Sequence, residues 1–299
     1  MKPTISIIIA LAPGRNAEVL QSLNHVNYPK EKYEVIIEEG LNPSENRNRG
    51  AAKAQGTILA FIDDDAYLGM NTLELVEKFF EHYPTIAIVG GPQLTPKNDH
   101  WFAQLSGIAI QSYFGTQKMS GRYAKRKINL HANESILTSA NCYVQKEAFY
   151  QIGGFDTRLF PGEDPEFFDR AHHKGFQLAY HPNIRVYHKR RNNYKDFVKQ
   201  FYKYGKTRLR KEKITKGNKR FLFYLPAIFT ISILPLFLLG FLYWIFWIPL
   251  LVYVILAVCF AAYESGKNLR LYGIILLPFL YLSIHVAYGL GMLKTMLST

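Results

Sequence analysis

Three consecutive aspartates give the strongest chemical signal in the sequence. Asp63, Asp64 and Asp65 directly follow an apolar run at 58–62, and carboxylates beside a buried strand are costly unless they meet a positive partner. In an extended chain Asp63 and Asp65 project to the same side, so together they could bind a divalent ion. Oxygen ligands suit Mg²⁺ or Mn²⁺ carried on a diphosphate. The alternative is an acidic cap at the start of a helix, which needs no ligand.

A second group of acids follows a glycine turn. Residues 153–156 read Gly-Gly-Phe-Asp, and residues 162–164 read Gly-Glu-Asp at the expected start of a helix. A carboxylate such as Asp164 could take the proton from an attacking hydroxyl group. Its proximity to Glu163 would raise the pKa of one of the two carboxyls. Helix capping by these acids is the alternative.

Rigid elements must hold these two groups of acids in place. Short apolar segments alternate with segments of helical pattern, which predicts an α/β fold with a mostly parallel sheet covered on both faces. Ligands bind such sheets at the carboxyl ends of the strands, where the aspartates fall. We interpret 5–11 as a buried strand rather than a secretion signal. The other expected strands are 33–37, 58–62 and 86–89, and the expected helices are 17–23, 45–54 and 72–82.

The net charge of +13 is concentrated in one segment. Residues 189–220 contain 14 basic and 2 acidic residues, whereas the rest of the chain is nearly balanced. Chromatin-like and ribosomal proteins spread their charge over a binding surface, so both classes are disfavoured, and no nucleic-acid partner is expected. The two cysteines are too few for a disulfide framework or a cysteine-bound metal.

The chain after this basic segment has the pattern of a membrane domain. No charged residue occurs between Phe221 and Tyr263, a run about twice the ~20 residues needed to cross a bilayer core. The expected spans cover 221–239, 242–263 and 271–293. Basic residues lie before the first span and between the second and third, so the positive-inside rule predicts an integral protein of the cell membrane with residues 1–188 in the cytosol. A soluble protein with buried apolar helices is the alternative.

An amphipathic helix is expected directly before the first span. Its apolar face would be formed by Tyr194, Phe197, Val198, Phe201 and Tyr202, with lysines on the remaining surface. A basic amphipathic helix at this place is typical of the membrane interface, where it meets anionic lipids. We therefore expect a cytosolic catalytic domain at 1–190, a basic juxtamembrane segment at 191–220, and a membrane domain with about three transmembrane helices at 221–299.

Taken together, these features resemble the family 2 glycosyltransferases, which are inverting enzymes of GT-A fold, here with a membrane-anchoring C-terminal segment. The resemblance covers about residues 4–220 and implies the fold of the nucleotide-diphospho-sugar transferases. It rests on the order and spacing of several runs: 5–9 (Ile-Ser-Ile-Ile-Ile), 46–50 (Asn-Arg-Asn-Arg-Gly), 60–66 (Ala-Phe-Ile-Asp-Asp-Asp-Ala), 140–142 (Ala-Asn-Cys), 153–156, 162–164 and 186–188 (Val-Tyr-His).

The resemblance implies metal-dependent transfer from a UDP- or GDP-linked sugar, with Mg²⁺ or Mn²⁺ as the cofactor. In this interpretation Asp65 and Asp63 coordinate the metal, and His188 completes the metal shell or contacts the diphosphate. Asp164 is the general base. Glu163 contacts the acceptor or orients the loop.

The resemblance also implies that several parts of the chain bind the donor: Glu38, Glu39, Arg47, Arg49, Asp63, Asp64 and Asn141. Within this set the aspartates hold the ribose and base, and the asparagine lies near the donor sugar. The arginines face the phosphates, or else are solvated helix residues. The two glutamates stand where the family usually has an aspartate, and the loop at 10–16 replaces the family's usual turn.

The acceptor side is assigned to the juxtamembrane segment. Gln200, Lys206 and Arg208 lie in a stretch that resembles this region of membrane family 2 enzymes, and we expect them to meet the phosphate of a lipid-linked acceptor. The chain lacks the Gln-x-x-Arg-Trp motif of processive synthases, which favours adding one or a few sugars to a polyprenyl-linked glycan. Two alternatives are a polyprenyl-phosphate glycosyltransferase and a non-catalytic membrane scaffold that binds nucleotide sugars.

Overall fold

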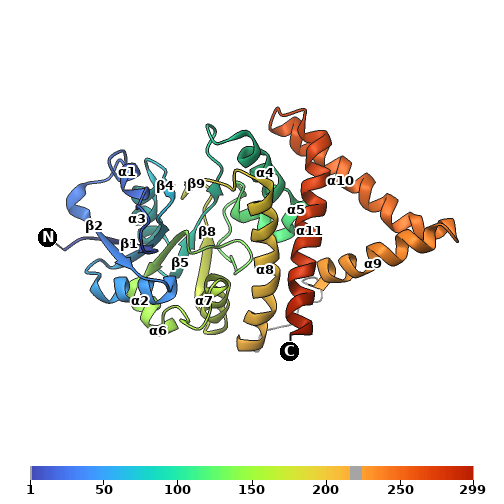
Figure 1. The fold of residues 1–299 in the computed structure, drawn as a ribbon. Helices are drawn as coiled ribbons and strands as arrows, with labels where there is room; N and C mark the ends of the chain where they lie inside the picture. The colour runs from blue at the N-terminus through green and yellow to red at the C-terminus, as the bar shows by residue number, and fades with distance from the viewer. Residues whose placement is uncertain (1, 216–223, 299) are drawn as a thin grey trace. The chain divides into compact units, whose positions relative to one another are not determined.

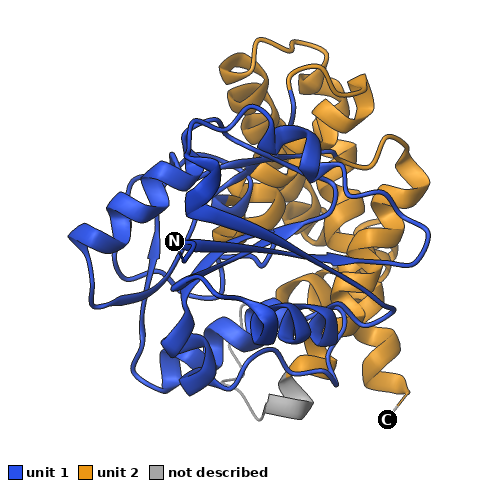
Figure 2. Cartoon of the chain, turned by 90° about the vertical axis from the view of Figure 1, so that its left-hand side faces the viewer, with its two compact units in different colours: residues 1–96, 121–189 blue, residues 97–120, 190–299 orange. Residues whose placement is uncertain are grey.

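The computed structural model describes residues 2–215 and 224–298 and divides into two compact units (Figure 2). The first unit contains Met1–Pro96 and Gly121–Lys189. The second contains Lys97–Ser120 and Arg190–Thr299, so a segment from the middle of the chain groups with the C-terminal helices.

A six-stranded sheet forms the centre of the first unit (Figure 1). Its spatial order is β2-β1-β3-β7-β5-β8, and only β7 runs antiparallel to its neighbours. The mostly parallel α/β sheet predicted from the sequence is therefore confirmed. The strands are β1 (Ile5–Leu11), β2 (Tyr33–Glu39), β3 (Ile58–Asp63), β5 (Ile86–Gly90), β7 (Asn141–Gln145) and β8 (Gln177–Tyr180).

Helices cover both faces of this sheet because successive strand residues point to opposite sides. Ile7 and Ile9 join a core under α1 (Val19–Leu23) and α3 (Thr72–His82). Ile8, between them, joins a core under the helices of the other face, α2 (Pro43–Lys53), α6 (Lys146–Ile152) and α7 (Glu163–His173). Short 3-10 turns occur at η1 (Lys30–Lys32) and η2 (Gln117–Arg122).

A small second sheet is formed by short strands that each follow a strand of the main sheet along the chain. It consists of β4 (Ala66–Leu68), β9 (Val186–His188) and β6 (Gln93–Leu94), in the order β4-β9-β6. The antiparallel pairing of β4 with β9 sets Ala66 opposite His188. This pairing places a histidine from late in the chain next to the three aspartates.

The second unit is helical. Two helices of the 97–120 segment, α4 (Trp101–Gln111) and α5 (Tyr113–Thr116), group with α8 (Tyr194–Thr215), α9 (Leu225–Gly240), η4 (Trp244–Phe246), α10 (Trp247–Lys267) and α11 (Gly273–Leu297). Helices α8 and α11 pack side by side (Figure 1). A Cβ at Gly205 would lie 2.0 Å from the Tyr288 carbonyl oxygen, and one at Gly291 would lie 2.1 Å from the Tyr202 carbonyl oxygen. Glycines thus allow the two backbones to approach closely.

Within residues 2–215 and 224–298, two helices are long and apolar enough to cross a membrane: 244–267 and Gly273–Leu297. Helix α9 is also apolar but has only 16 residues. The first three residues of the expected span 221–239 lie outside the described residues. The C-terminal region therefore carries two candidate membrane spans.

The expected amphipathic pattern falls on α8. Phe197 and Phe201 are buried, with ring centroids 5.0 Å apart. Phe197 also packs edge-on against Phe102 of α4, at 6.0 Å between ring centroids. These two aromatic side chains thus lie inside the second unit, whereas Tyr194 at the start of the helix is exposed.

Candidate active site

Asp63, Asp65 and His188 come together in the first unit as a possible metal site. One ligand atom from each lies within 4.8 Å of the others. His188 Nε2 is 3.0 Å from Asp65 Oδ1 and 3.8 Å from Asp63 Oδ2. Asp63 ends β3, Asp65 precedes β4, and the pairing of β4 with β9 brings in His188. The family resemblance implied Asp63 and Asp65 as metal ligands, and His188 as a further ligand or a contact to the diphosphate.

The chemistry of this group fits a divalent cation. Two carboxylates supply hard oxygen ligands of the kind that Mg²⁺ and Mn²⁺ prefer. His188 Nδ1 lies 2.9 Å from the Lys189 carbonyl oxygen. When Nδ1 carries the proton and donates to that carbonyl, the lone pair of Nε2 faces the two aspartates and is available to a metal.

The three aspartates differ in their pKa values. Burial disfavours the charged forms of Asp63 and Asp65, but without a metal the hydrogen bonds and charge of a protonated His188 outweigh it. Arg47 beside Asp63 and Arg15 beside Asp65 add to this effect, so both carboxyls have pKa values below their ordinary range. The pKa of Asp64 is raised to about 6 by burial and by the neighbouring Asp65 charge. Asp63 and Asp65 are therefore the carboxylates best able to stay ionised for a cation.

Arg15 contacts two of the three aspartates, and no role for it was predicted from the sequence. Its Nε lies 3.0 Å from Asp64 Oδ2, and its Nη2 lies 3.0 Å from Asp65 Oδ2. The arginine belongs to the loop between β1 and α1, the 10–16 stretch that departs from the family's usual turn. That departure was the one sequence signal that could have pointed to it.

Arg47 connects two parts of the site. Its Nη2 donates to Asp63 Oδ1 at 3.1 Å and its Nη1 donates to Glu163 Oε1 at 2.9 Å. The guanidinium lies 5.4 Å from the centre of the Phe155 ring, and the residue is buried. The sequence assigned this arginine to the donor phosphates, whereas the structure pairs it with two carboxylates.

The acidic pair at the start of α7 is asymmetric. Both carboxylate oxygens of Glu163 accept hydrogen bonds, one from Arg47 and one from the Gly162 backbone N–H at 2.9 Å. Burial raises the pKa of Glu163, and the Asp164 charge adds to this shift while Arg47 opposes it. Asp164 has a looser ion pair, 3.9 Å from its Oδ2 to Arg122 Nη1. Asp164 is thus the less tightly held of the two carboxylates.

Arg122 is a second residue that the sequence analysis missed. It is buried, and its guanidinium donates to the backbone carbonyls of Glu134 and Ser135. It lies in a stretch for which the sequence offered no motif. Its position beside Asp164 comes from tertiary packing.

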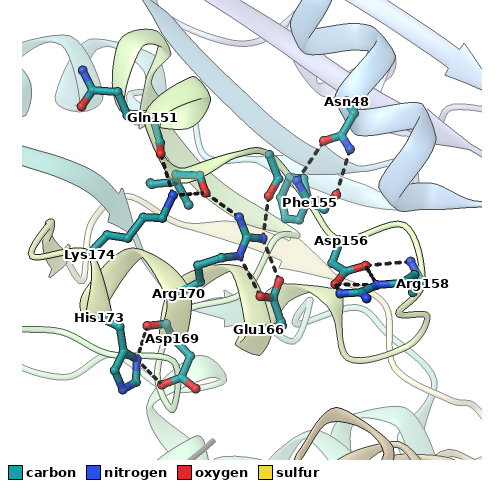
Figure 3. A network of polar contacts seen from close by, with 12 residues as sticks. Asn48, Gln151, Phe155, Asp156, Arg158, Glu166, Asp169, Arg170, His173 and Lys174 are labelled. Carbon is teal, nitrogen blue, oxygen red and sulfur yellow. Dashed lines mark hydrogen bonds and ion pairs between the residues drawn. The ribbon is translucent and has the colours of Figure 1, made fainter. Parts of the chain in front are cut away.

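The Gly-Gly-Phe-Asp turn is held by a polar network (Figure 3). Arg170 of α7 donates to the carbonyls of Ile152 and Gly154, each at 2.7 Å, and forms an ion pair with Glu166. Asn48 of α2 exchanges two 2.9 Å hydrogen bonds with the backbone of Phe155. These contacts connect the turn to α2 and α7. Because the acidic pair opens α7, they help to hold that end of the helix in place.

Glu38 and Glu39 occupy different environments. The Glu38 carboxylate is buried and accepts hydrogen bonds from Arg49 Nε at 3.2 Å and Lys53 Nζ at 2.5 Å. Glu39 is exposed, and its backbone carbonyl accepts a hydrogen bond from Arg49. Two residues expected at the donor, Glu38 and Arg49, thus form an ion-pair cluster with Lys53 between β2 and α2.

Asn141 is fully buried at the start of β7. Its Nδ2 donates to the carbonyl oxygens of Ile184, at 2.9 Å, and Pro92, at 3.4 Å. Its Oδ1 has no hydrogen-bond partner among the described residues. The amide group therefore anchors Ile184, which lies just before β9, the strand that carries His188.

The three residues expected at the acceptor all lie on α8 of the second unit. Gln200 donates to the Tyr204 hydroxyl at 2.9 Å. At 3.6 residues per turn, Arg208 lies about 80° around the helix from Gln200, and the exposed Lys206 lies about 120° from Gln200 in the other direction. The helix thus does not bring all three onto one face.

A family model described as "Glycosyl transferase family group 2" matches residues 58–261, from β3 into α10. The chain is 23% identical over 270 residues to Glycosyltransferase AglE of Haloferax volcanii, covering 79% of this chain and 84% of the relative. It is 26% identical over 286 residues to a Methanococcus voltae enzyme, covering 83% of this chain and 85% of the relative. That enzyme is named dolichyl N-acetyl-alpha-D-glucosaminyl phosphate 3-beta-D-2,3-diacetamido-2,3-dideoxy-beta-D-glucuronosyltransferase.

Among solved structures, the chain resembles the mannosyltransferase PcManGT of Pyrobaculum calidifontis, determined in complex with GDP-Man and Mn²⁺. The TM-score is 0.60 at 14% sequence identity, and the match covers 100% of this chain and 88% of the other. This likeness supports a GT-A fold.

Proposed function

The chain belongs to the glycosyl transferase family group 2, and from this premise we propose that it moves a sugar from a UDP- or GDP-linked donor to a lipid-linked acceptor, with inversion. The observation that carries the proposal is the continuous contact from Asp63 through Arg47 to Glu163. It joins a possible metal site to an acidic pair that could supply a base.

The donor side of the proposal rests on Asp63, Asp65 and His188. A divalent ion held by these residues would neutralise charge on the departing nucleoside diphosphate. Both carboxyls have pKa values below their ordinary range, so they are ionised at neutral pH and able to bind a cation. His188 in turn is oriented by the Lys189 carbonyl, which leaves its Nε2 directed at the aspartates.

We assign the proton-accepting step to Asp164. In an inverting transfer a carboxylate takes the proton of the acceptor hydroxyl as that oxygen attacks the sugar from the side opposite the leaving group. Asp164 suits this role because it is the more loosely held member of the pair. Glu163 suits a positioning role because both of its oxygens are already hydrogen-bonded.

The lipid-linked acceptor is supported by the Methanococcus voltae relative, whose name specifies a dolichyl phosphate-linked sugar. The apolar helices α10 and α11, together with the shorter apolar helix α9, would anchor the chain in the cell membrane as three spans. The positive-inside rule applied to the basic residues of α8 would place the first unit in the cytosol. Gln200, Lys206 and Arg208 remain our candidates for contact with the lipid phosphate.

The proposal is tested with the full-length chain in detergent or liposomes. Labelled UDP- and GDP-sugars are supplied with an extracted membrane lipid fraction, with Mn²⁺ or with EDTA, and lipid-soluble label is measured. We expect Mn²⁺-dependent transfer to give a product whose new bond resists mild acid.

Other products would identify the alternatives. A monosaccharide released by mild acid would identify a polyprenyl-phosphate glycosyltransferase. Donor binding without any transfer would identify a non-catalytic scaffold. Long polymer products, or equal transfer in EDTA, would contradict the proposal.

A further inference from the structure

Arg15 belongs to a loop that is fastened to the middle aspartate of the acidic run. Its guanidinium Nε lies 3.0 Å from Asp64 Oδ2. The Asp64 backbone carbonyl accepts a hydrogen bond from the Val19 N–H at 3.0 Å, at the start of α1. Asp64 thus contacts the loop through an ion pair and the following helix through a backbone hydrogen bond.

Asp64 differs from its neighbours in what it contacts. The possible metal group uses Asp63 and Asp65, and within the described residues Asp64 lies outside that group. Its side chain is only 8% exposed, and it faces Arg15. The geometry therefore gives Asp64 a partner other than a metal ion or a ribose.

Asp65 contacts two other side chains through its two oxygens. Its Oδ1 faces His188 Nε2 and its Oδ2 faces Arg15 Nη2, each at 3.0 Å. The Arg15 side chain is 50% exposed, so part of the guanidinium remains open to solvent. A divalent ion on Asp65 would repel this guanidinium, whereas a diphosphate beside the ion would attract both.

We propose that Arg15, held by Asp64, is the second cation of the donor site and binds the diphosphate of the nucleotide jointly with the metal. The inference rests on the proposed function and deepens it. It assigns Arg15 to the donor phosphates and makes Asp64 a positioning residue. Arg15 disfavours the metal alone and favours the metal together with nucleoside diphosphate, so the two ligands bind cooperatively.

The test measures binding rather than turnover. Mn²⁺ binding is followed by the loss of its free electron paramagnetic resonance signal, without nucleotide and with saturating UDP or GDP. UDP and GDP binding in Mn²⁺ is followed by calorimetry. The variants are R15Q, R15K and D64N. The matched control is R158Q, because Arg158 is also an exposed arginine paired with an aspartate, Asp156 (Figure 3).

In R15Q, we expect the affinities for the two ligands to change in opposite directions. R15Q should bind Mn²⁺ alone more tightly than wild type and should bind the diphosphate about tenfold or more weakly in Mn²⁺. R15K should lose less nucleotide affinity than R15Q. D64N should weaken nucleotide binding through the misplaced Arg15, and R158Q should match wild type.

Two results would overturn the inference. One is nucleotide affinity in R15Q equal to wild type. The other is an equal loss of Mn²⁺ and nucleotide binding, which would mean that the site had merely collapsed. If wild type itself binds neither UDP nor GDP in Mn²⁺, the proposed function fails instead, so the two failures are distinguishable.

Discussion

Asp63 and Glu163 share one guanidinium. Arg47 donates to Asp63 at 3.1 Å and to Glu163 at 2.9 Å, although the two acids are 100 positions apart in the chain. Asp63 ends a central strand and Glu163 begins α7. A single buried side chain on α2 thus fixes the spacing between the possible metal site and the candidate base.

Replacing Arg47 should destabilise the first unit strongly. R47M leaves two carboxylates without their shared cation, and breaking a buried ion pair from one side costs about 3–5 kcal/mol in the free energy of unfolding. Thermal or denaturant unfolding in detergent measures the change. R158M is the control, because Arg158 is exposed and its loss should leave stability close to wild type. Equal stability of the two variants would show that the bridge contributes little.

Replacing Asp65, a proposed metal ligand, should weaken metal binding without unfolding the protein. D65N loses a negative oxygen ligand, so Mn²⁺ affinity in the presence of nucleotide should fall at least about tenfold. D169N is the matched control, since Asp169 lies on α7 and pairs with His173 (Figure 3). Calorimetric titration with Mn²⁺ checks both. Wild-type affinity in D65N would remove this residue from the metal site.

Glu38 should make stability sensitive to acid. Its hydrogen bond from Lys53 lowers its pKa below the ordinary value of 4.5, against the opposing effect of burial, and Arg49 adds to the lowering. A lowered folded-state pKa gives stability that is present above the ordinary pKa and is lost as the pH falls through the folded value.

The matching experiment compares E38Q with wild type across pH. The gap between their unfolding midpoints should be largest near about pH 6 and should shrink toward about pH 3. E39Q is the control, because the Glu39 side chain is exposed. A gap that stays constant over this range would contradict the assignment of the acid sensitivity to Glu38.

The close approach of α8 and α11 predicts a glycine requirement. A Cβ at Gly291 would lie 2.1 Å from the Tyr202 carbonyl oxygen, so G291A should force the helices apart and cost about 1–3 kcal/mol. In α10, a Cβ at Gly266 would meet nothing within 4 Å, so G266A should be neutral or slightly stabilising. Unfolding midpoints in detergent compare the two. Equal effects would argue against tight packing of α8 on α11.

Much of the fold could be predicted because its signals are local. Apolar strands alternating with helices predicted the parallel sheet, and the Asp-x-Asp spacing predicted two of the three residues of the possible metal site. His188 followed from the family resemblance, and the pairing of β4 with β9 supplies its physical reason.

What the sequence did not reveal depends on tertiary contacts. Arg15 reaches the acids from the unusual 10–16 loop and Arg122 from the end of η2, and no motif marks either arginine as their partner. The grouping of 97–120 with the C-terminal helices is equally non-local. Local spacing also could not show that Arg47 faces two carboxylates.

The most direct test of the account compares D164N with wild type in one transfer assay. Sugar transfer to the lipid acceptor should fall by at least about 100-fold, because the general base is lost. Mn²⁺-dependent donor binding, measured on the same preparation, should stay at the wild-type level. Transfer by D164N at the wild-type rate would contradict the assignment of Asp164 as the base.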